Sequence, residues 1–274
     1  MKYTTEKIYI PAGERKLKLL ILSPKNRRTD RTGLLWIHGG GYVTGMAGMV
    51  HMSRAKNIVQ KYGAVVISPD YRLAGKAPYP AALEDCHTAL TYLKEHSKEL
   101  GIRTDQIMVG GESAGGGLAA ALCMYEKDTG GVNIAFQMPL YPMIDREDTE
   151  TSKNNRSLVW NTRHNHYGWR KYLAGLSGEI PCYASAARRK DYSGLPPAYT
   201  FVSTAEPFYS ETVTYIENLK KAGIPAEIDI YPGLYHAFDM LTPFRRASKI
   251  AGARFDERFL YAQKHYFAEQ KGEI

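Results

Sequence analysis

The sequence predicts a layered α/β fold built on a mostly parallel sheet. Apolar, β-branched segments alternate with amphipathic segments along most of the 274-residue chain, as is typical of strands joined by crossover helices. A chain of this length with 44% hydrophobic residues can bury one large core. We therefore expect a single domain, residues 1–274, in which helices cover both faces of an eight-stranded sheet.

The strands are expected where short apolar runs are bounded by turn residues. The first two runs read as a hairpin around Pro11-Ala12-Gly13, and helix-length segments separate the later ones. The predicted strands are residues 4–10, 16–23, 33–37, 64–68, 106–110, 134–140, 198–203 and 226–231. The predicted helices are residues 49–62, 80–97, 114–129, 210–222 and 247–268.

A serine lies between two glycines at one predicted strand-to-helix junction, in Gly111-Glu112-Ser113-Ala114-Gly115. This is the form of a nucleophile elbow, in which a strained turn points the serine hydroxyl out of the sheet edge. The helix that follows is rich in glycine and alanine, so we expect its axis to press closely on the sheet. The G-x-S-x-G pattern also occurs by chance in loops, so Ser113 needs further support as a nucleophile.

The run His38-Gly39-Gly40-Gly41-Tyr42 follows the predicted strand 33–37. Three glycines expose backbone N–H groups, and the amides of Gly40 and Gly41, with that of Ala114, are suited to hold the oxyanion of a tetrahedral intermediate. An isolated glycine run is more often a flexible turn, but one that precedes a G-x-S-x-G motif favours the oxyanion interpretation. We also predict that Tyr42 contacts the substrate.

The partners of the serine are sought in the order acid, then histidine. Glu206 follows the predicted strand 198–203, and His236 lies in a turn-rich loop after strand 226–231. A carboxylate at residue 206 would accept the imidazole N–H and stabilise the imidazolium formed when the serine loses its proton. Glu211, further along the chain, is the competing acid.

Five motifs occur in order along the chain: His38 to Gly41, Asp70-Tyr71-Arg72-Leu73, Tyr79-Pro80 through Asp85, Gly111 to Gly116, and Tyr231-Pro232-Gly233 through His236. Together, over roughly residues 30–270, they resemble the hormone-sensitive-lipase-like family of α/β-hydrolase esterases. The resemblance implies an α/β-hydrolase fold, with Ser113 as nucleophile, His236 as base and Glu206 as acid. It also implies Gly40, Gly41 and Ala114 as oxyanion donors. Asp70, Arg72 and Asp85 are expected to brace loops around the cleft.

The chain departs from the family pattern in three places. Glu206 stands where the family usually has aspartate, and Glu112 stands at an elbow position where aspartate is commoner. Members of the family usually begin with part of a helical lid, whereas strand-like sequence starts near Thr4 here. We therefore expect a reduced helical cap, formed by an insertion at about residues 146–194, and a comparatively open cleft.

These residues predict a serine hydrolase that cleaves carboxylic esters through an acyl-enzyme. The resemblance implies short acyl groups, from acetyl to about hexanoyl, and no cofactor. Amide, formamide or lactone hydrolysis would use the same residues and remains an alternative. A ligand-binding protein on the same fold is a second alternative, which the retained His236 disfavours.

Composition limits the partners. The net charge is +8, but the basic residues are scattered and the densest run, Arg188-Arg189-Lys190, has only three, so a solvated surface is favoured over nucleic-acid binding. Weak attraction to anionic substrates or surfaces is the alternative. We find no secretory signal and no apolar run long enough to span a membrane. The sequence is compatible with a homodimer.

The cysteines and histidines bear on the cellular compartment and on metal binding. Cys86, Cys123 and Cys182 cannot all pair, which predicts a reducing, cytoplasmic compartment. No C-x-x-C or H-E-x-x-H spacing supports a metal site. His164 and His166 form the only local histidine pair, and we expect both to face solvent or pack within the cap.

Overall fold

A single sheet organises the fold. The computed structural model describes residues 2–26 and 28–271. Its strands are β1 (Tyr3–Ala12), β2 (Arg15–Pro24), β3 (Arg31–Ile37), β4 (Val65–Pro69), β5 (Ile102–Glu112), β6 (Phe136–Leu140), β7 (Ala198–Ser203) and β8 (Ala226–Tyr231). They lie in the order β1-β2-β4-β3-β5-β6-β7-β8. β2 pairs antiparallel with both β1 and β4, and the remaining pairs are parallel. The predicted eight-stranded, mostly parallel sheet is confirmed.

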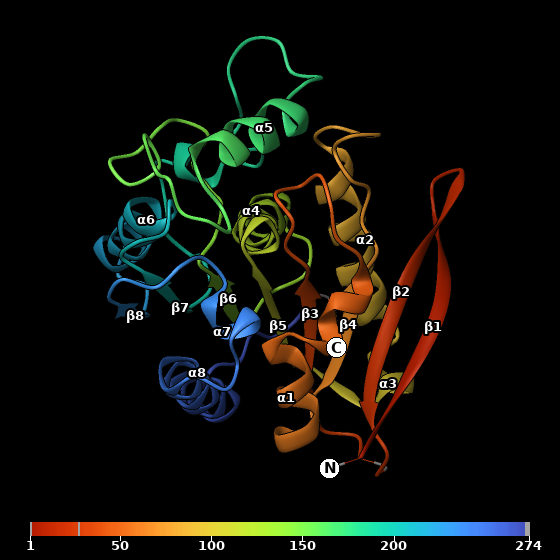
Figure 1. Ribbon diagram of the computed structural model, residues 1–274. Coiled ribbons are helices and arrows are strands. Elements are labelled where there is room, and N and C mark those ends of the chain that lie inside the picture. The colour runs from red at the N-terminus through yellow and green to blue at the C-terminus, as the bar shows by residue number, and fades with distance from the viewer. Residues whose placement is uncertain (1, 27, 272–274) are drawn as a thin grey trace.

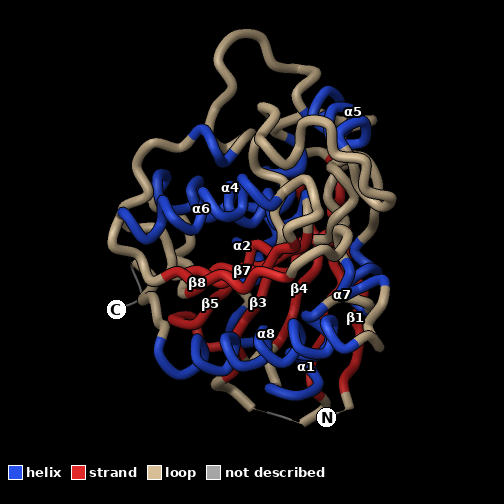
Figure 2. Tube along the Cα trace, turned by 60° about the vertical axis from the view of Figure 1, so that its left-hand side comes forward, coloured by secondary structure: helices blue, strands red, loops and turns tan. Residues whose placement is uncertain are grey.

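Helices cover both faces of this sheet. The α-helices are α1 (Arg54–Tyr62), α2 (Ala81–Glu95), α3 (Ser97–Leu100), α4 (Ala114–Thr129), α5 (Thr162–Tyr172), α6 (Tyr209–Lys221), α7 (Phe238–Leu241) and α8 (Arg246–His265). Two short 3₁₀ helices, η1 (Ala47–His51) and η2 (Ala186–Arg188), lie in connecting segments. α2, α4 and α6 pack on one face, and α1 and α8 pack on the other (Figures 1 and 2). α5 lies beyond α4, away from the sheet (Figure 1).

The side chains of β3 divide between the two layers. Leu35 and Ile37 join the core beneath α2 and α4, whereas Leu34 and Trp36 join the core beneath α1 and α8. All four are fully buried. Burial on both faces explains why the central strands are continuous apolar runs rather than alternating ones.

One predicted helix is divided by a capping serine. The Ser53 hydroxyl accepts the N–H of Ala55 at 3.1 Å and donates to the carbonyl of Val50 at 2.8 Å. Because this cap starts α1 at Arg54, the predicted helix 49–62 is two elements, η1 and α1.

Charged side chains brace the connections near the sheet edge. The Asp85 carboxylate is buried and accepts hydrogen bonds from the Arg72 backbone, at 2.8 Å, and from the guanidinium groups of Arg72 and Arg15. Asp70 pairs separately with Lys18 at 2.6 Å and accepts the Ala47 N–H at 2.8 Å. Asp70, Arg72 and Asp85, which were expected to brace the loops together, therefore belong to two separate groups of contacts.

Other expectations concern thiols, membranes and metals. Cys86 and Cys123 are buried and Cys182 is half-buried, all as free thiols. Across residues 2–26 and 28–271, no helix combines the length and apolar character needed to cross a bilayer. The same residues contain no cluster of three or more potential metal ligands. His164 and His166 are both exposed on α5.

An ion pair joins α2 to α4. His87 Nδ1 lies 2.5 Å from Glu126 Oε1, and the Glu126 side chain is buried whereas that of His87 is 36% exposed. The hydrogen bond to Glu126 raises the pKa of His87 above its ordinary value. The folded protein therefore holds this proton more tightly than the unfolded chain does.

We expect part of the folding free energy to be lost as pH rises through the folded-state pKa of His87. A raised pKa stabilises the fold fully below the unfolded value of about 6.5, and this contribution disappears above the folded value. Because the imidazole is partly exposed, the contribution is at most about 1 kcal/mol. Chemical denaturation of the wild type and of His87→Gln, at about pH 6 and about pH 8, measures it. The variant should lose less stability over this interval, and identical losses would contradict the prediction.

Candidate active site

Ser113 occupies the turn between β5 and α4 in a strained backbone conformation. Its φ is 58° and its ψ is −121°. The Ser113 N–H donates to the carbonyl of Leu140 at 3.0 Å, and the Ser113 carbonyl accepts the N–H groups of Gly117 and Met143 at 2.9 and 3.0 Å. Because the turn is fixed on both sides by backbone hydrogen bonds, the strain is held by the surrounding structure.

Two glycines allow this turn to form. A Cβ added to Gly115 would lie 2.1 Å from the carbonyl oxygen of Ile37. A Cβ added to Gly111 would lie 2.5 Å from the carbonyl oxygens of Ile37 and Gly115. Only glycine therefore lets the Ser113 turn lie against the end of β3.

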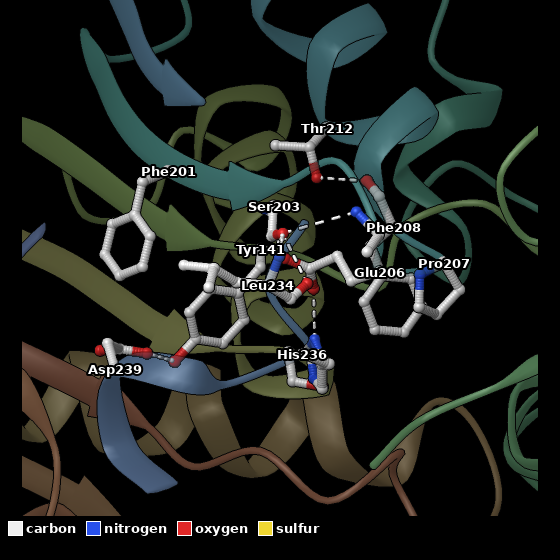
Figure 3. Close-up of polar contacts among 12 residues, drawn as sticks. Tyr141, Phe201, Ser203, Glu206, Pro207, Phe208, Thr212, Leu234, His236 and Asp239 are labelled. Carbon is white, nitrogen blue, oxygen red and sulfur yellow. Dashed lines mark hydrogen bonds and ion pairs between the residues drawn. The ribbon is translucent and has the colours of Figure 1, made fainter. Parts of the chain in front are cut away.

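The structure brings Ser113, His236 and Glu206 together. His236 Nε2 lies 2.9 Å from Ser113 Oγ, and His236 Nδ1 is hydrogen-bonded to Glu206 Oε2 (Figure 3). The other Glu206 oxygen accepts the Ser203 N–H at 2.8 Å, and all three predicted residues are buried. Because a carboxylate only accepts hydrogen bonds, Nδ1 carries the proton of the neutral imidazole and Nε2 is left to accept from the serine hydroxyl.

The imidazole is fixed by its surroundings as well. The rings of Tyr141 and Phe208 meet the His236 ring edge-on, with centroids 5.1 and 5.0 Å away. The Ser203 hydroxyl donates to the Leu234 carbonyl at 2.5 Å and accepts the Leu234 N–H at 2.8 Å, so it ties the end of β7 to the histidine loop (Figure 3). The acid and the histidine are thereby held by one connected set of contacts.

A buried network lies next to His236. The Tyr141 hydroxyl donates to Asp239 Oδ1 at 3.0 Å, and Arg54 Nε donates to Asp239 Oδ2 at 2.9 Å. Asp239 is completely buried and Arg54 nearly so. The network joins α1, α7 and the end of β6 behind the imidazole. Arg54 and Asp239 escaped the sequence analysis because they are separated by 185 residues.

Glu112, directly before Ser113, ties the turn to β3. The indole N–H of Trp36 donates to Glu112 Oε2 at 2.8 Å. Burial raises the pKa of Glu112 well above its ordinary value, and the nearby Asp239 carboxylate raises it further. Both effects favour the neutral acid over the carboxylate.

The competing acid, Glu211, lies in a different contact set. Its Oε1 accepts the backbone N–H groups of Ile144 and Asp145 at 2.7 and 3.2 Å, and burial raises its pKa well above the ordinary value. Glu211 therefore holds the segment after β6, whereas Glu206 contacts the imidazole.

The glycine loop follows β3 as predicted. Gly40 and Gly41 have φ values of 121° and 58°, and a Cβ on Gly41 would lie 2.1 Å from the Trp160 ring. His38 Nδ1 lies 2.8 Å from the Gly39 carbonyl, so this nitrogen must be the donor. The loop lines a cavity of about 250 Å³ that reaches Ser113 and His236. Its other walls are formed by Met49, Met52, Glu112, Tyr141, Val159, Trp160, Ala237, Met240 and Leu241.

Tyr42 does not line this cavity. Its side chain is buried, its hydroxyl donates to the Met143 carbonyl at 2.7 Å, and its ring stacks on Tyr172 at 4.0 Å. This differs from the substrate contact that we predicted, because a φ of 65° at Tyr42 directs the ring into the core. Tyr42 therefore anchors the glycine loop to α5.

Backbone strain gathers at the site. Five non-glycine residues in the described chain have positive φ, and four of them, Tyr42, Ser113, Tyr141 and Ala237, lie in or beside the loops around the cavity. Strained residues cluster where function requires a fixed geometry. Tyr141 and Trp160 were not predicted as site residues, because neither belongs to a motif with a known spacing to the serine.

Comparisons with known proteins agree with this fold. A family profile described as alpha/beta hydrolase fold matches residues 34–240. Esterase LipI of Mycobacterium tuberculosis (strain ATCC 25618 / H37Rv) is 32% identical over 75% of this chain and 65% of its own length. Carboxylesterase NlhH of Mycobacterium tuberculosis (strain CDC 1551 / Oshkosh) is 31% identical over 75% of this chain and 66% of its own length. The chain thus spans slightly less than two thirds of these relatives.

Solved structures resemble the whole fold. A bacterial heroin esterase superposes with a TM-score of 0.89 and 31% identity, covering 96% of this chain and 84% of the other. Esterase LipW from Mycobacterium marinum superposes with a TM-score of 0.86 and 28% identity, covering 95% and 82%.

We expect Gly115→Ala to destabilise the fold by at least about 2 kcal/mol, because the new methyl group would meet two backbone oxygens that cannot move independently. The oxygens are those of Ile37 and His38, at 2.1 and 2.5 Å. Gly48→Ala is the matched control, since its Cβ would have no neighbour closer than 3.9 Å. Urea denaturation compares the two variants, and equal stabilities would contradict the prediction.

Proposed function

The chain belongs to the α/β-hydrolase-fold family, and from that premise we propose that it is a serine hydrolase of carboxylic esters. The observation that carries the proposal is the 2.9 Å approach of His236 Nε2 to Ser113 Oγ beside the Glu206 carboxylate. The names of the relatives, esterase and carboxylesterase, support the same reaction class.

The proposed first half-reaction forms an acyl-enzyme. Ser113 Oγ attacks the ester carbonyl carbon while its proton passes to His236 Nε2, and Glu206 stabilises the resulting imidazolium. The backbone N–H groups of Gly40, Gly41 and Ala114 are the proposed donors to the oxyanion, each typically worth roughly 2.7 to 4 kcal/mol of barrier. The N-terminus of α4 adds the positive end of its dipole. The alcohol leaves with the proton held by His236.

The proposed second half-reaction releases the acid. His236 takes a proton from water, the hydroxide attacks the acyl carbonyl, and the proton returns to Ser113 Oγ as the carboxylic acid departs. Every proton in this cycle moves through His236, so the cycle uses no cofactor.

We propose short acyl chains, from acetyl to about hexanoyl, as the preferred substrates. The cavity beside Ser113 holds about 250 Å³ and has largely apolar walls. Trp160, supplied by the proposed cap insertion 146–194, packs against Gly41 and limits the space near the reacting carbonyl.

The three free thiols support the proposed reducing, cytoplasmic compartment. That the protein forms a homodimer stays a prediction.

We expect Ser113→Ala to lower kcat for a chromogenic butyryl ester by roughly a million-fold. Glu206→Gln should lower it by roughly ten-thousand-fold, because the amide cannot hold the imidazole in the correct tautomer. Glu211→Gln is the matched control: its Oε1 can still accept both backbone N–H groups, so turnover should remain near the wild-type value. Steady-state kinetics of the three purified variants test this assignment.

Two outcomes would contradict the assignment. Wild-type turnover in Ser113→Ala would remove Ser113 from the mechanism. A severe loss in Glu211→Gln with little loss in Glu206→Gln would move the acid to Glu211. A parallel panel of aryl amides, formamides and lactones separates ester hydrolysis from the other reactions available to the same residues.

We expect Trp160→Ala to extend the acyl range. Removing the indole enlarges the cavity, so kcat/KM for an octanoyl ester relative to a butyryl ester should rise by about tenfold or more. Leu158→Ala is the control, because this side chain in the same loop is 95% exposed and lies outside the cavity wall. An unchanged ratio in Trp160→Ala would show that the indole does not limit the acyl group.

A further inference from the structure

Three segments that are far apart in the sequence meet at the cavity, and we call residues 44–58, 151–163 and 240–255 the cavity rim. The first supplies Met49 and Met52 to the cavity wall. The second supplies Val159 and Trp160, and the third supplies Met240 and Leu241. A surface that contacts these six lining residues would lie at the entrance to Ser113.

The cavity rim exposes large apolar side chains to solvent. Leu158 is 95% exposed, Phe244 is 86% exposed and Met52 is 67% exposed. Met46 and Leu241, at 59% and 57%, belong to the same segments. Apolar side chains that are scattered singly need no explanation, but several on segments that line one cavity indicate an interaction surface.

The charges of the cavity rim have one sign. None of its three segments contains an aspartate or a glutamate. Three acids directly flank the segments: Glu150 is exposed, Asp239 is buried against Arg54 and Tyr141, and Asp256 pairs with Lys61. Six exposed cations form no salt bridge with any residue of the described chain. They are Lys153, Arg156, Arg163, Arg245, Arg246 and Lys249.

We propose that the cavity rim docks on an anionic lipid surface. Its apolar side chains would enter the headgroup region while its cations contact lipid phosphates, which is the pattern of peripheral membrane binding. A protein seated on the same residues would close the cavity, whereas a lipid surface would leave apolar esters facing the entrance. The proposal goes beyond ester hydrolysis, because docking does not depend on which bond is cleaved.

The docking is weak, reversible and sensitive to salt. The exposed cations each interact with the negative surface potential only within a short screening distance. A few apolar side chains add too little buried area for permanent anchoring. We therefore expect binding to anionic vesicles at low ionic strength, little binding to neutral vesicles, and release by added sodium chloride.

Co-sedimentation with vesicles tests the docking independently of catalysis. The protein carries Ser113→Ala, so no lipid is consumed, and the vesicles contain phosphatidylcholine alone or an equal mixture with phosphatidylglycerol. The double variant R245E/R246E and the single variant Phe244→Asp should each weaken partitioning onto the mixed vesicles by about tenfold or more. Glutamate is well tolerated at the N-terminus of α8, where the helix dipole favours negative charge.

Matched controls lie on the β1–β2 hairpin, at the edge of the sheet opposite β7 and β8 (Figure 1). K7E/K16E changes the net charge as much as R245E/R246E does, and Tyr9→Asp removes an aromatic ring that is 56% exposed. Both controls should partition within about twofold of the parent protein. Equal partitioning onto neutral and mixed vesicles, or equal losses in the hairpin controls, would overturn the proposal.

A separate assay distinguishes failure of docking from failure of the proposed reaction. With Ser113 restored, the R245E/R246E and Phe244→Asp variants should hydrolyse a water-soluble acetyl ester at the parental rate. Loss of vesicle binding with retained hydrolysis supports the docking surface. A parallel loss of soluble-ester hydrolysis in these variants would overturn it, because their effect would then lie in the folded cavity.

Discussion

The close approach of the Ser113 turn to the end of β3 is the contact on which the rest of the site depends. Gly111 and Gly115 leave room for carbonyl oxygens that any side chain would displace. The glycine loop continues directly from β3, so this one contact also sets the distance between the serine hydroxyl and the loop. The proposed oxyanion donors and the proposed nucleophile are therefore positioned by the same packing.

Parallel strands explain how distant residues reach this contact. β5 leads into Ser113, β7 into the turn of Glu206, and β8 into the loop of His236. Because β7 and β8 are neighbours with Ser203 opposite Tyr231, their carboxyl ends deliver acid and histidine to the same edge of the sheet. The Ser203 hydroxyl then joins the two loops. Convergence is thus a property of strand order rather than of long-range attraction between side chains.

The sequence predicted the parts of the site that follow strands in a known order, and missed the parts that depend on packing. It favoured Glu206 over the competing acid Glu211 from position alone, since both acids follow β7. The backbone N–H groups of Ile144 and Asp145, which donate to Glu211, become visible only in three dimensions. Tyr42 follows the glycines directly, yet its backbone turns the ring into the core. The Arg54–Asp239 pair has no local pattern at all.

The same strand order ties the site to the surface around it. A segment that leaves the carboxyl end of a parallel strand lies at that edge of the sheet. The segments of the cavity rim leave such strand ends, and they therefore lie around the Ser113 site. Its exposed side chains, such as Leu158 and Phe244, contribute little to the core. They can therefore change without cost to the fold, while the glycines beneath them cannot. The proposed catalytic geometry and the proposed docking surface are in this way separable features of one sheet edge.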